Sequence, residues 1–545
     1  MKHEDTALDL LFTPLSPIHI GCGETSMIGE YLFHNGNCHH LNPTSVLDCL
    51  DEGDRKRLVQ IVEQTTGQSM IKQLQGFYQE RAEQLLPAST ASFPVPNGIE
   101  RYYDKRIGRI NQNQVVNQLK LERHTHSPLD QLPYIPGSSL KGAIRTAWLQ
   151  ERLDQNPQAA RLLGHRRPQY NSYKCDKEVK RLQGNLLEMP NANDVTSDPF
   201  SQVAVADMVS HLGIRRSVLL SDRLSLKKGE ITGIRALREV ILPLQPSMAK
   251  GQIRLKNRST DAFPDSKIRQ EIPLPALIRS INDFYLPKLR EDMALFEGLC
   301  STAPFADKAN WLGSMKRLLP LIERGVKTSQ LMVVKLGRDG GAVSKTWDNY
   351  RQINIPQLKK LLSHPTTLPV ACTKEHDRSP AMPFGWAILH GPDNELFDAL
   401  RKEESDWWSG YDNAQETLQN TLQERQQRLV KEKALKAEQH AKVIAQQKEQ
   451  ARQQQEEVER RAQMSEEDKL IDDLQKAFAN EKQIGRIDAS GELRTQLTEV
   501  IVTIAADGNG EQKQVLTQLA KSICQYWSLN LKKNKKMKTL IGQLS

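Results

Sequence analysis

The segment PGSSLKGAIR, residues 136–145, brings together groups that can hold a phosphate. Pro136 and Gly137 favour a turn, and helical periodicity follows, so free main-chain N–H groups are expected at a helix start. Lys141 and Arg145 are four residues apart and share one face of that helix. Free N–H groups, hydroxyls and two aligned cations suit a phosphate. An ordinary capped helix with surface charges is the alternative that this segment leaves open.

The details of this helix give three further expectations. Ser138 or Ser139 is expected to cap a helix that begins near Leu140. Gly142 costs about 1 kcal/mol relative to alanine inside a helix, which predicts close approach of another backbone there. The lysine precedes the second glycine, whereas a Walker A loop has the order GxxxxGKS or GxxxxGKT. ATP hydrolysis is therefore not indicated.

A second segment, PIHIGCGET at residues 17–25, places a strand before two glycines. Gly21 and Gly23 would let a ligand or a second chain approach the main chain closely. The spacing is not GxGxxG, so a dinucleotide-binding fold is not indicated. His19 could stack on a base or contact a phosphate. The alternative is a buried histidine in a hairpin.

A third segment, VVKLGRDGGAVSKTW at residues 333–347, is a strand that ends in a glycine-rich turn. Lys335, Arg338 and Lys345 lie close to that turn. A fourth segment, PFGWAIL at residues 383–389, is predicted to be a short strand.

Acidic and histidine residues are candidates for catalysis. Asp207, in VAVADM, and Asp222, in LLSDRLS, lie beside apolar runs, where an aspartate could also simply cap a strand or turn. His124 and His126 would place both rings on one side of a strand, which suits acid–base chemistry or a metal. The sequence offers this histidine pair no third ligand nearby.

The composition is that of a large protein with more than one core. The chain has 545 residues, a net charge of +9 and 6% aromatic residues. The charge permits a polyanionic partner, but a broad stacking platform is not indicated. Seven dispersed cysteines without a CxxC pair predict reduced thiols and a cytoplasmic protein. No apolar run reaches the roughly 18–20 residues of a membrane span, and no signal-peptide pattern is present.

The secondary structure changes in kind along the chain. Strands and helices mingle without regular alternation up to about residue 395, which predicts an α+β fold. The Asn35-Gly36 pair between two short apolar runs predicts a hairpin. All 27 prolines lie at or before Pro392, so the remainder is expected to be helical.

This helical remainder divides into a long charged helix at 396–464 and a small module at 465–545, which Ser465 is expected to cap. Apolar residues recur every seven positions in the long helix, which predicts a partial coiled-coil seam. A solvated spacer helix is the alternative. The recurring residues are Ala437, Ile444, Ala451 and Val458.

The order of the four glycine-rich or strand segments resembles the RAMP superfamily of CRISPR proteins. The segments are TPLSPIHIGCGE, YIPGSSLKGAIRTA, LGRDGGAVSKT and PFGWAIL. Within that superfamily the chain most resembles the fifth subunits of type III-A (Csm) effector complexes, over residues 7–395. The resemblance implies two RRM-like, ferredoxin-like RAMP domains with helical insertions, at 1–230 and 231–395. It gives no counterpart for the helix and module after about residue 400.

The resemblance also implies a function. Such a subunit caps the 3′ end of crRNA, supports crRNA maturation and antiviral defence, and has no catalytic residue, cofactor or metal. Its partners would be crRNA, the backbone and other subunits of the complex, and host nucleases for 3′ trimming. Arg338 and Asp339 depart from the small or aromatic residues expected in the late loop. The residues expected to contact RNA or a neighbouring subunit are His19, Gly21, Gly23, Ser138, Ser139, Lys141, Arg145, Lys335, Gly337, Gly340, Gly341 and Lys345.

Three alternatives remain open at this stage. The chain could fill another RAMP position, either a Cmr-type end subunit or a backbone subunit. It could be a crRNA-processing endoribonuclease that uses His19 as acid or base. It could also be a scaffold that recruits a partner through its long helix.

Overall fold

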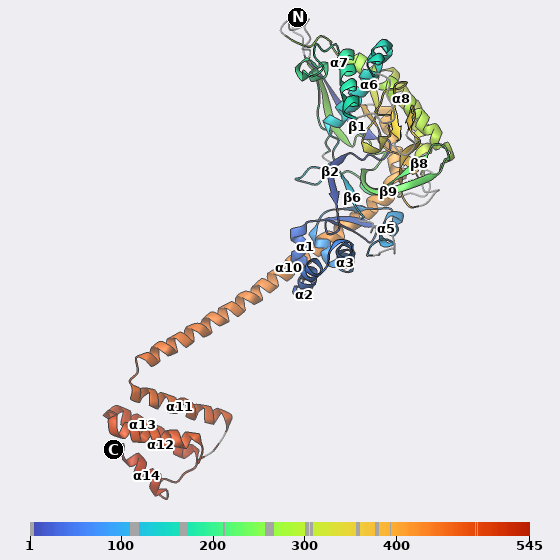
Figure 1. The fold of residues 1–545 in the computed structure, drawn as a ribbon. Coiled ribbons are helices and arrows are strands. Elements are labelled where there is room, and N and C mark those ends of the chain that lie inside the picture. The colour runs from blue at the N-terminus through green and yellow to red at the C-terminus, as the bar shows by residue number, and fades with distance from the viewer. Residues whose placement is uncertain are drawn as a thin grey trace. The chain divides into compact units, whose positions relative to one another are not determined.

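The computed structural model describes residues 5–108, 119–163, 172–210, 213–256, 266–299, 305, 309–355, 360–375, 381–392, 394–485, 487 and 489–545. The chain forms two compact units, residues 1–429 and 430–545 (Figure 1). The first unit is α+β and the second is helical, which confirms the fold class expected from the sequence. No helix in the described part of the chain is long and apolar enough to cross a membrane.

The first unit contains a five-stranded sheet in which every neighbouring pair is antiparallel. Helices α6, α8 and α9 pack against its edge strand β11, and α6 and α8 pack against each other. In spatial order the strands are β11 (Leu331–Lys335), β16 (Trp386–His390), β1 (Thr6–Pro14), β10 (Ala249–Leu255) and β7 (Val203–Val205).

A six-stranded sheet lies in the same unit, with one parallel pair between β6 and β9. In spatial order its strands are β15 (Ala381–Pro383), β14 (Thr367–Cys372), β8 (Arg216–Ser225), β9 (Ile231–Ile241), β6 (Leu121–His124) and β2 (Gly21–Ser26). The boundary expected at 230/231 lies in the turn between the paired strands β8 and β9. Both sheets contain strands from both sides of that boundary.

The remaining strands of the first unit form two small sheets. One is β3 (Tyr31–His34), β4 (Asn37–Leu41) and β5 (Ser89–Pro94), and the other is β12 (Ile353–Ile355) with β13 (Lys360–Leu362). The turn between β3 and β4 has positive φ at both Asn35 (51°) and Gly36 (73°), which is the backbone of a type I′ hairpin. The hairpin predicted from the Asn-Gly pair is confirmed.

The helices of the first unit lie between these strands in the chain. They are α1 (Pro43–Cys49), α2 (Glu52–Gln64), α3 (Gly67–Glu80), α4 (Ala82–Leu85), α5 (Asn97–Asp104), α6 (Gly137–Gln155), α7 (Ser172–Leu186), α8 (Leu274–Leu295) and α9 (Trp311–Lys327). Short 3₁₀ turns link them at Leu86–Ala88, Pro157–Leu163, Val195–Ser197, Pro199–Gln202, Phe296–Gly298 and Arg338–Gly340.

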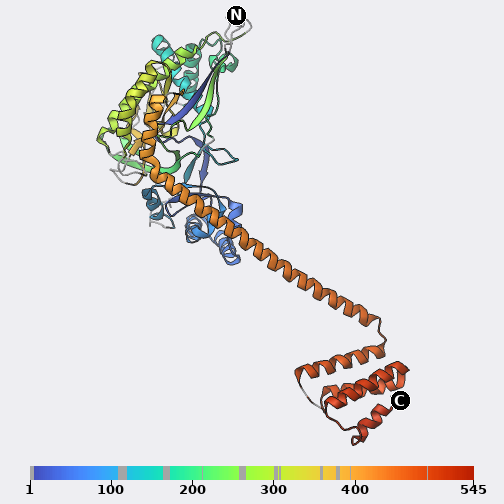
Figure 2. The ribbon, with the colours of Figure 1, turned by 180° about the vertical axis from the view of Figure 1, so that it is seen from behind.

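Helix α10 (Asn394–Ala462) begins in the core of the first unit (Figure 2). Trp407, Trp408 and Tyr411 are buried there, and both tryptophans donate hydrogen bonds, Trp407 to Ser314 Oγ (2.9 Å) and Trp408 to the Pro243 carbonyl (3.0 Å). The helix therefore starts as a packed element of the α+β unit. The charged character that the sequence shows applies to its later part.

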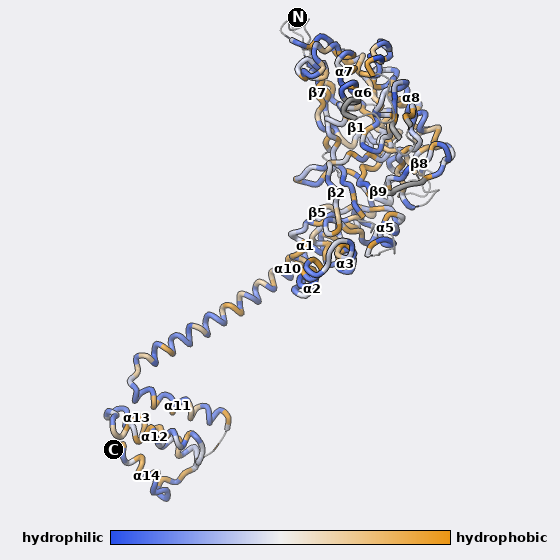
Figure 3. Tube along the Cα trace, in the orientation of Figure 1, coloured by the Kyte–Doolittle hydropathy of each residue, from blue (hydrophilic) through white to orange (hydrophobic). Residues whose placement is uncertain are grey.

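That later part is mostly hydrophilic, with isolated apolar positions (Figure 3). The four residues of the expected seven-residue seam are all exposed. The second unit then packs its own core from α11 (Glu466–Ile484), α12 (Glu492–Asp507), α13 (Gly510–Tyr526) and α14 (Lys535–Gly542). Ser465 caps α11 by accepting from the Asp468 N–H at 3.1 Å, as the sequence predicts.

Candidate functional site

Three segments that are far apart in the sequence meet around one cavity of about 530 Å³. They are strand β2, the first turns of α6, and the glycine-rich turn after β11. The lining residues are Ile20, Gly21, Gly23, Glu24, Thr25, Glu122, Ser139, Gly142, Ala143, Thr146, Tyr285, Lys335, Leu336, Gly337, Arg338, Ser344 and Lys345. The glycine-rich segments singled out from the sequence thus form one site.

Six of the twelve expected contact residues line this cavity and six do not. Those in the lining are Gly21, Gly23, Ser139, Lys335, Gly337 and Lys345. Those outside it are His19, Ser138, Lys141, Arg145, Gly340 and Gly341.

Gly337 holds two chain segments together at the cavity wall. Its φ is +84°, and a Cβ on it would lie 2.2 Å from the His19 carbonyl oxygen. That same carbonyl accepts a hydrogen bond from the Arg338 N–H at 3.2 Å. Only glycine allows this approach, because any side chain would overlap the His19 backbone. Gly337 therefore allows the glycine-rich turn to pack against the backbone of His19.

His19 lies in the core, so the expectation that its ring contacts RNA is wrong for this structure. The residue is 1% exposed, and its Nδ1 donates to the Glu239 carbonyl at 2.8 Å. Burial lowers its pKa, and the hydrogen bond to Glu239 only partly offsets this effect. The buried-histidine alternative describes this residue.

The start of α6 differs from the expectation in its cap. The helix begins at Gly137 after Pro136, and neither serine caps it. Instead Asp207 Oδ1, from the segment after β7, accepts from the Gly137 N–H at 2.7 Å. A carboxylate at a helix N-terminus stabilises the helix by about 0.5–2 kcal/mol. Asp207, considered above as a catalytic candidate, is thus a cap supplied from elsewhere in the chain.

The two cations of α6 are not among the residues that line the cavity. Arg145 forms an ion pair with Asp198 at 2.8 Å and lies over the Phe200 ring at 5.0 Å. Lys141 is half-buried, and burial lowers its pKa. Gly142, in contrast, is exposed in the cavity wall, with no atom within 4 Å of where its Cβ would lie. The close backbone approach predicted at Gly142 is therefore wrong, and its small size leaves room in the cavity.

The cations of the late segment are partly committed to protein partners. Lys335 is buried and its Nζ lies 2.6 Å from Asp292 Oδ2. Lys345 Nζ donates to the Arg338 carbonyl at 2.7 Å, and burial lowers its pKa. Arg338 pairs with Glu122 at 2.9 Å but keeps 66% of its side chain exposed. Arg338 and Lys345 are both exposed in this lining, but the Lys345 amine is held by a main-chain carbonyl, so Arg338 offers the accessible charge.

A buried ion network behind the cavity was not foreseen from the sequence. Arg238, on β9, pairs with Glu122 and with Asp339, whose Oδ2 lies 3.0 Å from Nε. These pairs tie the glycine-rich turn to the six-stranded sheet. The only hint in the sequence was that Arg338 and Asp339 stand where the RAMP resemblance leads us to expect small or aromatic residues. Asp339 has a structural partner, which explains an acid at that position.

The two histidines considered as a metal pair do not share a site. The His124 ring is buried: its Nδ1 accepts from the Ile20 N–H at 3.1 Å, and its Nε2 donates to the Tyr134 carbonyl at 3.2 Å. Burial lowers the pKa of His124 to about 4. His126 lies instead beside Glu24, with Nε2 3.9 Å from a carboxylate oxygen.

Comparison with known proteins agrees with the order of the segments and the α+β fold. The RAMP superfamily model matches residues 11–485, so this chain belongs to the RAMP superfamily. The resemblance expected from the four segments is confirmed.

The similar proteins include curated relatives named CRISPR system Cms protein Csm5. The chain is 25% identical over 241 residues to the one from Mycobacterium tuberculosis, covering 43% of this chain and 63% of that relative. It is 23% identical over 197 residues to the one from Methanocaldococcus jannaschii, covering 36% and 41%. The chain thus spans less than two thirds of the length of these relatives.

Two solved structures are also similar. One, described as a Csm–crRNA–target RNA ternary complex of a type III-A CRISPR-Cas system, gives a TM-score of 0.40 at 15% identity, over 70% of this chain and all of that chain. The other, a crystal structure of T. onnurineus Csm5, gives 0.39 at 16% identity, over 69% and 99%.

Proposed function

We propose that this chain is an RNA-binding subunit of a type III-A CRISPR (Csm) effector complex. In this proposal it binds the 3′ end of crRNA, supports crRNA maturation in antiviral defence, and contacts the neighbouring RAMP subunits. Host nucleases would perform the 3′ trimming. Membership of the RAMP superfamily and the similarity to proteins named Csm5 support this proposal.

One observation carries the RNA-binding part of the proposal: the glycine-rich segments converge on a single polar cavity. Its volume of about 530 Å³ falls within the range of about 300–1,000 Å³ typical of ligand sites. Ser139 and Arg338 offer a hydroxyl and an accessible guanidinium, and Gly21 and Gly23 leave the main chain exposed. Such groups bind the sugar–phosphate backbone and read no base sequence. Guide pairing would then supply the sequence specificity.

We also propose that the chain has no nuclease activity of its own. Three of the residues that the sequence nominated as acid or base, Asp207, His19 and His124, are engaged in structural roles. Asp207 caps α6, and His19 and His124 are buried in hydrogen bonds to the main chain. A general acid or base must reach the proton that it transfers, which these side chains do not do here.

A matched pair of arginine variants tests the RNA site. Arg338→Ala removes the accessible cation of the cavity, and Arg290→Ala removes an arginine of similar exposure (52%) that pairs with Glu323 outside the cavity lining. Binding of a labelled single-stranded RNA of mixed sequence is followed by fluorescence anisotropy across a salt series. We expect Arg338→Ala to weaken binding and to reduce the salt slope by about 0.7 for one lost phosphate contact. Arg290→Ala should behave as wild type.

Two results would contradict the proposal. If Arg338→Ala binds RNA with the wild-type affinity and salt slope, the cavity is not the RNA site. If the purified chain cleaves the probe without metal, the endoribonuclease alternative is favoured.

A further inference from the structure

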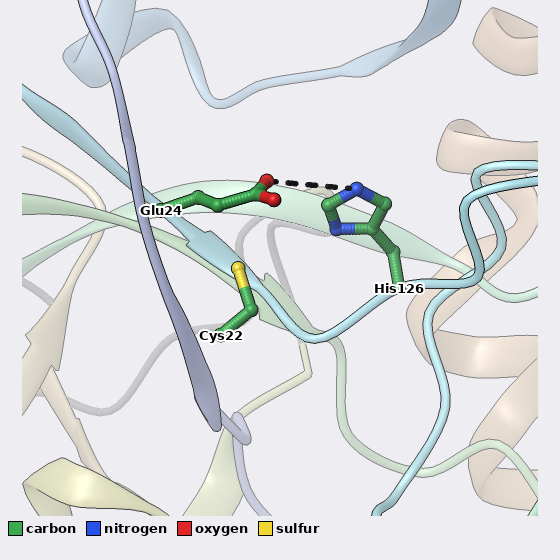
Figure 4. Close-up of side chains that lie close together, drawn as sticks. All are labelled: Cys22, Glu24 and His126. Carbon is green, nitrogen blue, oxygen red and sulfur yellow. Dashed lines mark ion pairs between the residues drawn. The ribbon is translucent and has the colours of Figure 1, made fainter.

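Three side chains with metal-binding atoms meet at the rim of the six-stranded sheet. They are Cys22, Glu24 and His126, and one ligand atom from each lies within 4.8 Å of the other two. Figure 4 shows the Glu24 carboxylate and the His126 ring facing each other, with the Cys22 sulfur below them. Thiol, imidazole and carboxylate are the ligand types of zinc sites.

The two strands that carry these residues explain why they meet. Strand β2 pairs antiparallel with β6, with Gly21 opposite His124 and a register shift before Thr25. Cys22 and Glu24 lie in the irregular part of β2, on either side of Gly23, whose φ is +88°. His126 follows the end of β6. The paired residues Gly21 and Thr25 bracket this part of β2 and hold it beside the end of β6.

A hydrogen bond orients the histidine as a ligand. His126 Nδ1 donates to the His124 carbonyl at 2.9 Å, which leaves Nε2 as the nitrogen with a free lone pair. That Nε2 is the atom that faces Glu24. Metal-binding histidines are held in the same way by a carbonyl or carboxylate on the second nitrogen. The ring is also fixed by packing, since the side chain is only 8% exposed.

The Glu24 carboxylate is available to a metal. Arg123 Nη1 and His126 Nε2 both lie 3.9 Å from the same oxygen, which is longer than a hydrogen bond. Arg123 instead donates a hydrogen bond to Gln131 Oε1 at 3.0 Å, and its Nε lies 3.7 Å from the carboxylate of the buried Glu239. The Cys22 thiol donates a long hydrogen bond to the Arg123 carbonyl at 3.8 Å, which a metal-bound thiolate would give up.

We propose that Cys22, Glu24 and His126 bind one zinc ion, with the fourth coordination position open. Bonds of about 2.0–2.3 Å in a tetrahedral site require the ligand atoms to approach within about 3.4–3.6 Å of each other. Glu24 and Cys22 are exposed, so their side chains can rotate to close the remaining distance. A thiol ligand favours zinc over magnesium or calcium, which prefer oxygen.

Cobalt(II) titration of the full-length chain, after treatment with a chelator, tests this site. Cobalt replaces zinc in tetrahedral sites, and a thiolate ligand gives a sulfur-to-cobalt charge-transfer band in the near ultraviolet. We expect one equivalent to give this band and zinc to displace it. Cys22→Ser should abolish the band, and Glu24→Gln, at an exposed position that folding tolerates, should weaken cobalt binding at least about 10-fold. Cys49→Ser is the control, since Cys49 lies outside the cluster.

The proposal is wrong if no charge-transfer band forms with several equivalents of cobalt. It is also wrong if Cys22→Ser keeps the band, because another cysteine then supplies the thiolate. Unchanged affinity in Glu24→Gln would remove the carboxylate from the ligand set and leave only two ligands, which overturns the three-ligand site. The RNA proposal does not bear on any of these outcomes.

Discussion

The glycines of the cavity could be needed for either of two reasons: packing of the chain against itself, or access for a ligand. Replacing Gly337 by alanine tests the first reason. Two costs add at this position. With φ +84° and ψ 172°, Gly337 lies in a region that is essentially reserved for glycine, and a side chain there costs about 1–3 kcal/mol. A Cβ 2.2 Å from the His19 carbonyl oxygen must push the two segments apart by about 1 Å, and such overpacking costs about 1–3 kcal/mol. We therefore expect the free energy of unfolding of Gly337→Ala to fall by about 2–6 kcal/mol.

Gly23 is the matched control because it shares the positive φ of Gly337 without the contact. Its φ is +88°, and no atom lies within 4 Å of where its Cβ would be. Gly23→Ala should therefore cost only the backbone part, about 1–2 kcal/mol. Urea unfolding of the full chain, followed by tryptophan fluorescence, reports on the first unit, which holds all but one of the seven tryptophans. If Gly337→Ala is no less stable than Gly23→Ala, the packing explanation is refuted.

Two further predictions concern the buried histidines and the long helix. Burial lowers the pKa of His124 to about 4, so the folded state binds a proton there only at a lower pH than the unfolded state does. The free energy of unfolding therefore falls as the pH drops from about 6.5 to 4. His124→Gln should reduce that fall by about 3 kcal/mol in urea titrations at each pH, and an unchanged pH slope would contradict this. Removal of residues 430–545 should leave the tryptophan unfolding midpoint of the first unit unchanged, whereas removal of 394–545, which takes away Trp407 and Trp408, should prevent folding. A lowered midpoint in the shorter deletion would show that the second unit supports the first.

Local chemistry predicted local structure well. The Asn35-Gly36 pair predicted its hairpin because that turn needs positive φ at both residues. Ser465 predicted the start of α11, since its hydroxyl serves an N–H three residues on. The meeting of the glycine-rich segments at one cavity was not predicted from the sequence. Strand pairing across hundreds of residues has no local signal that would have given it.

The errors share one physical cause, which is a partner supplied from a distant part of the chain. Asp207 caps α6 in place of Ser138 or Ser139, from about 70 residues further on. Lys335 looks like a free cation in the sequence, but Asp292 on α8 neutralises it. The Cys22 cluster needed the pairing of β2 with β6, so His126 could not be separated from His124 by spacing alone.

Strand β1 has a consequence for how the chain is made. It is made well before its partners β10 and β16, which pair with it through residues 249–255 and 387–390. At about 5–20 residues per second, β16 follows β1 by roughly 20–75 seconds. Throughout that interval β1 has at least one open edge, and open edges pair with other chains. The cavity likewise cannot be complete before its last lining residue, Lys345, has been made.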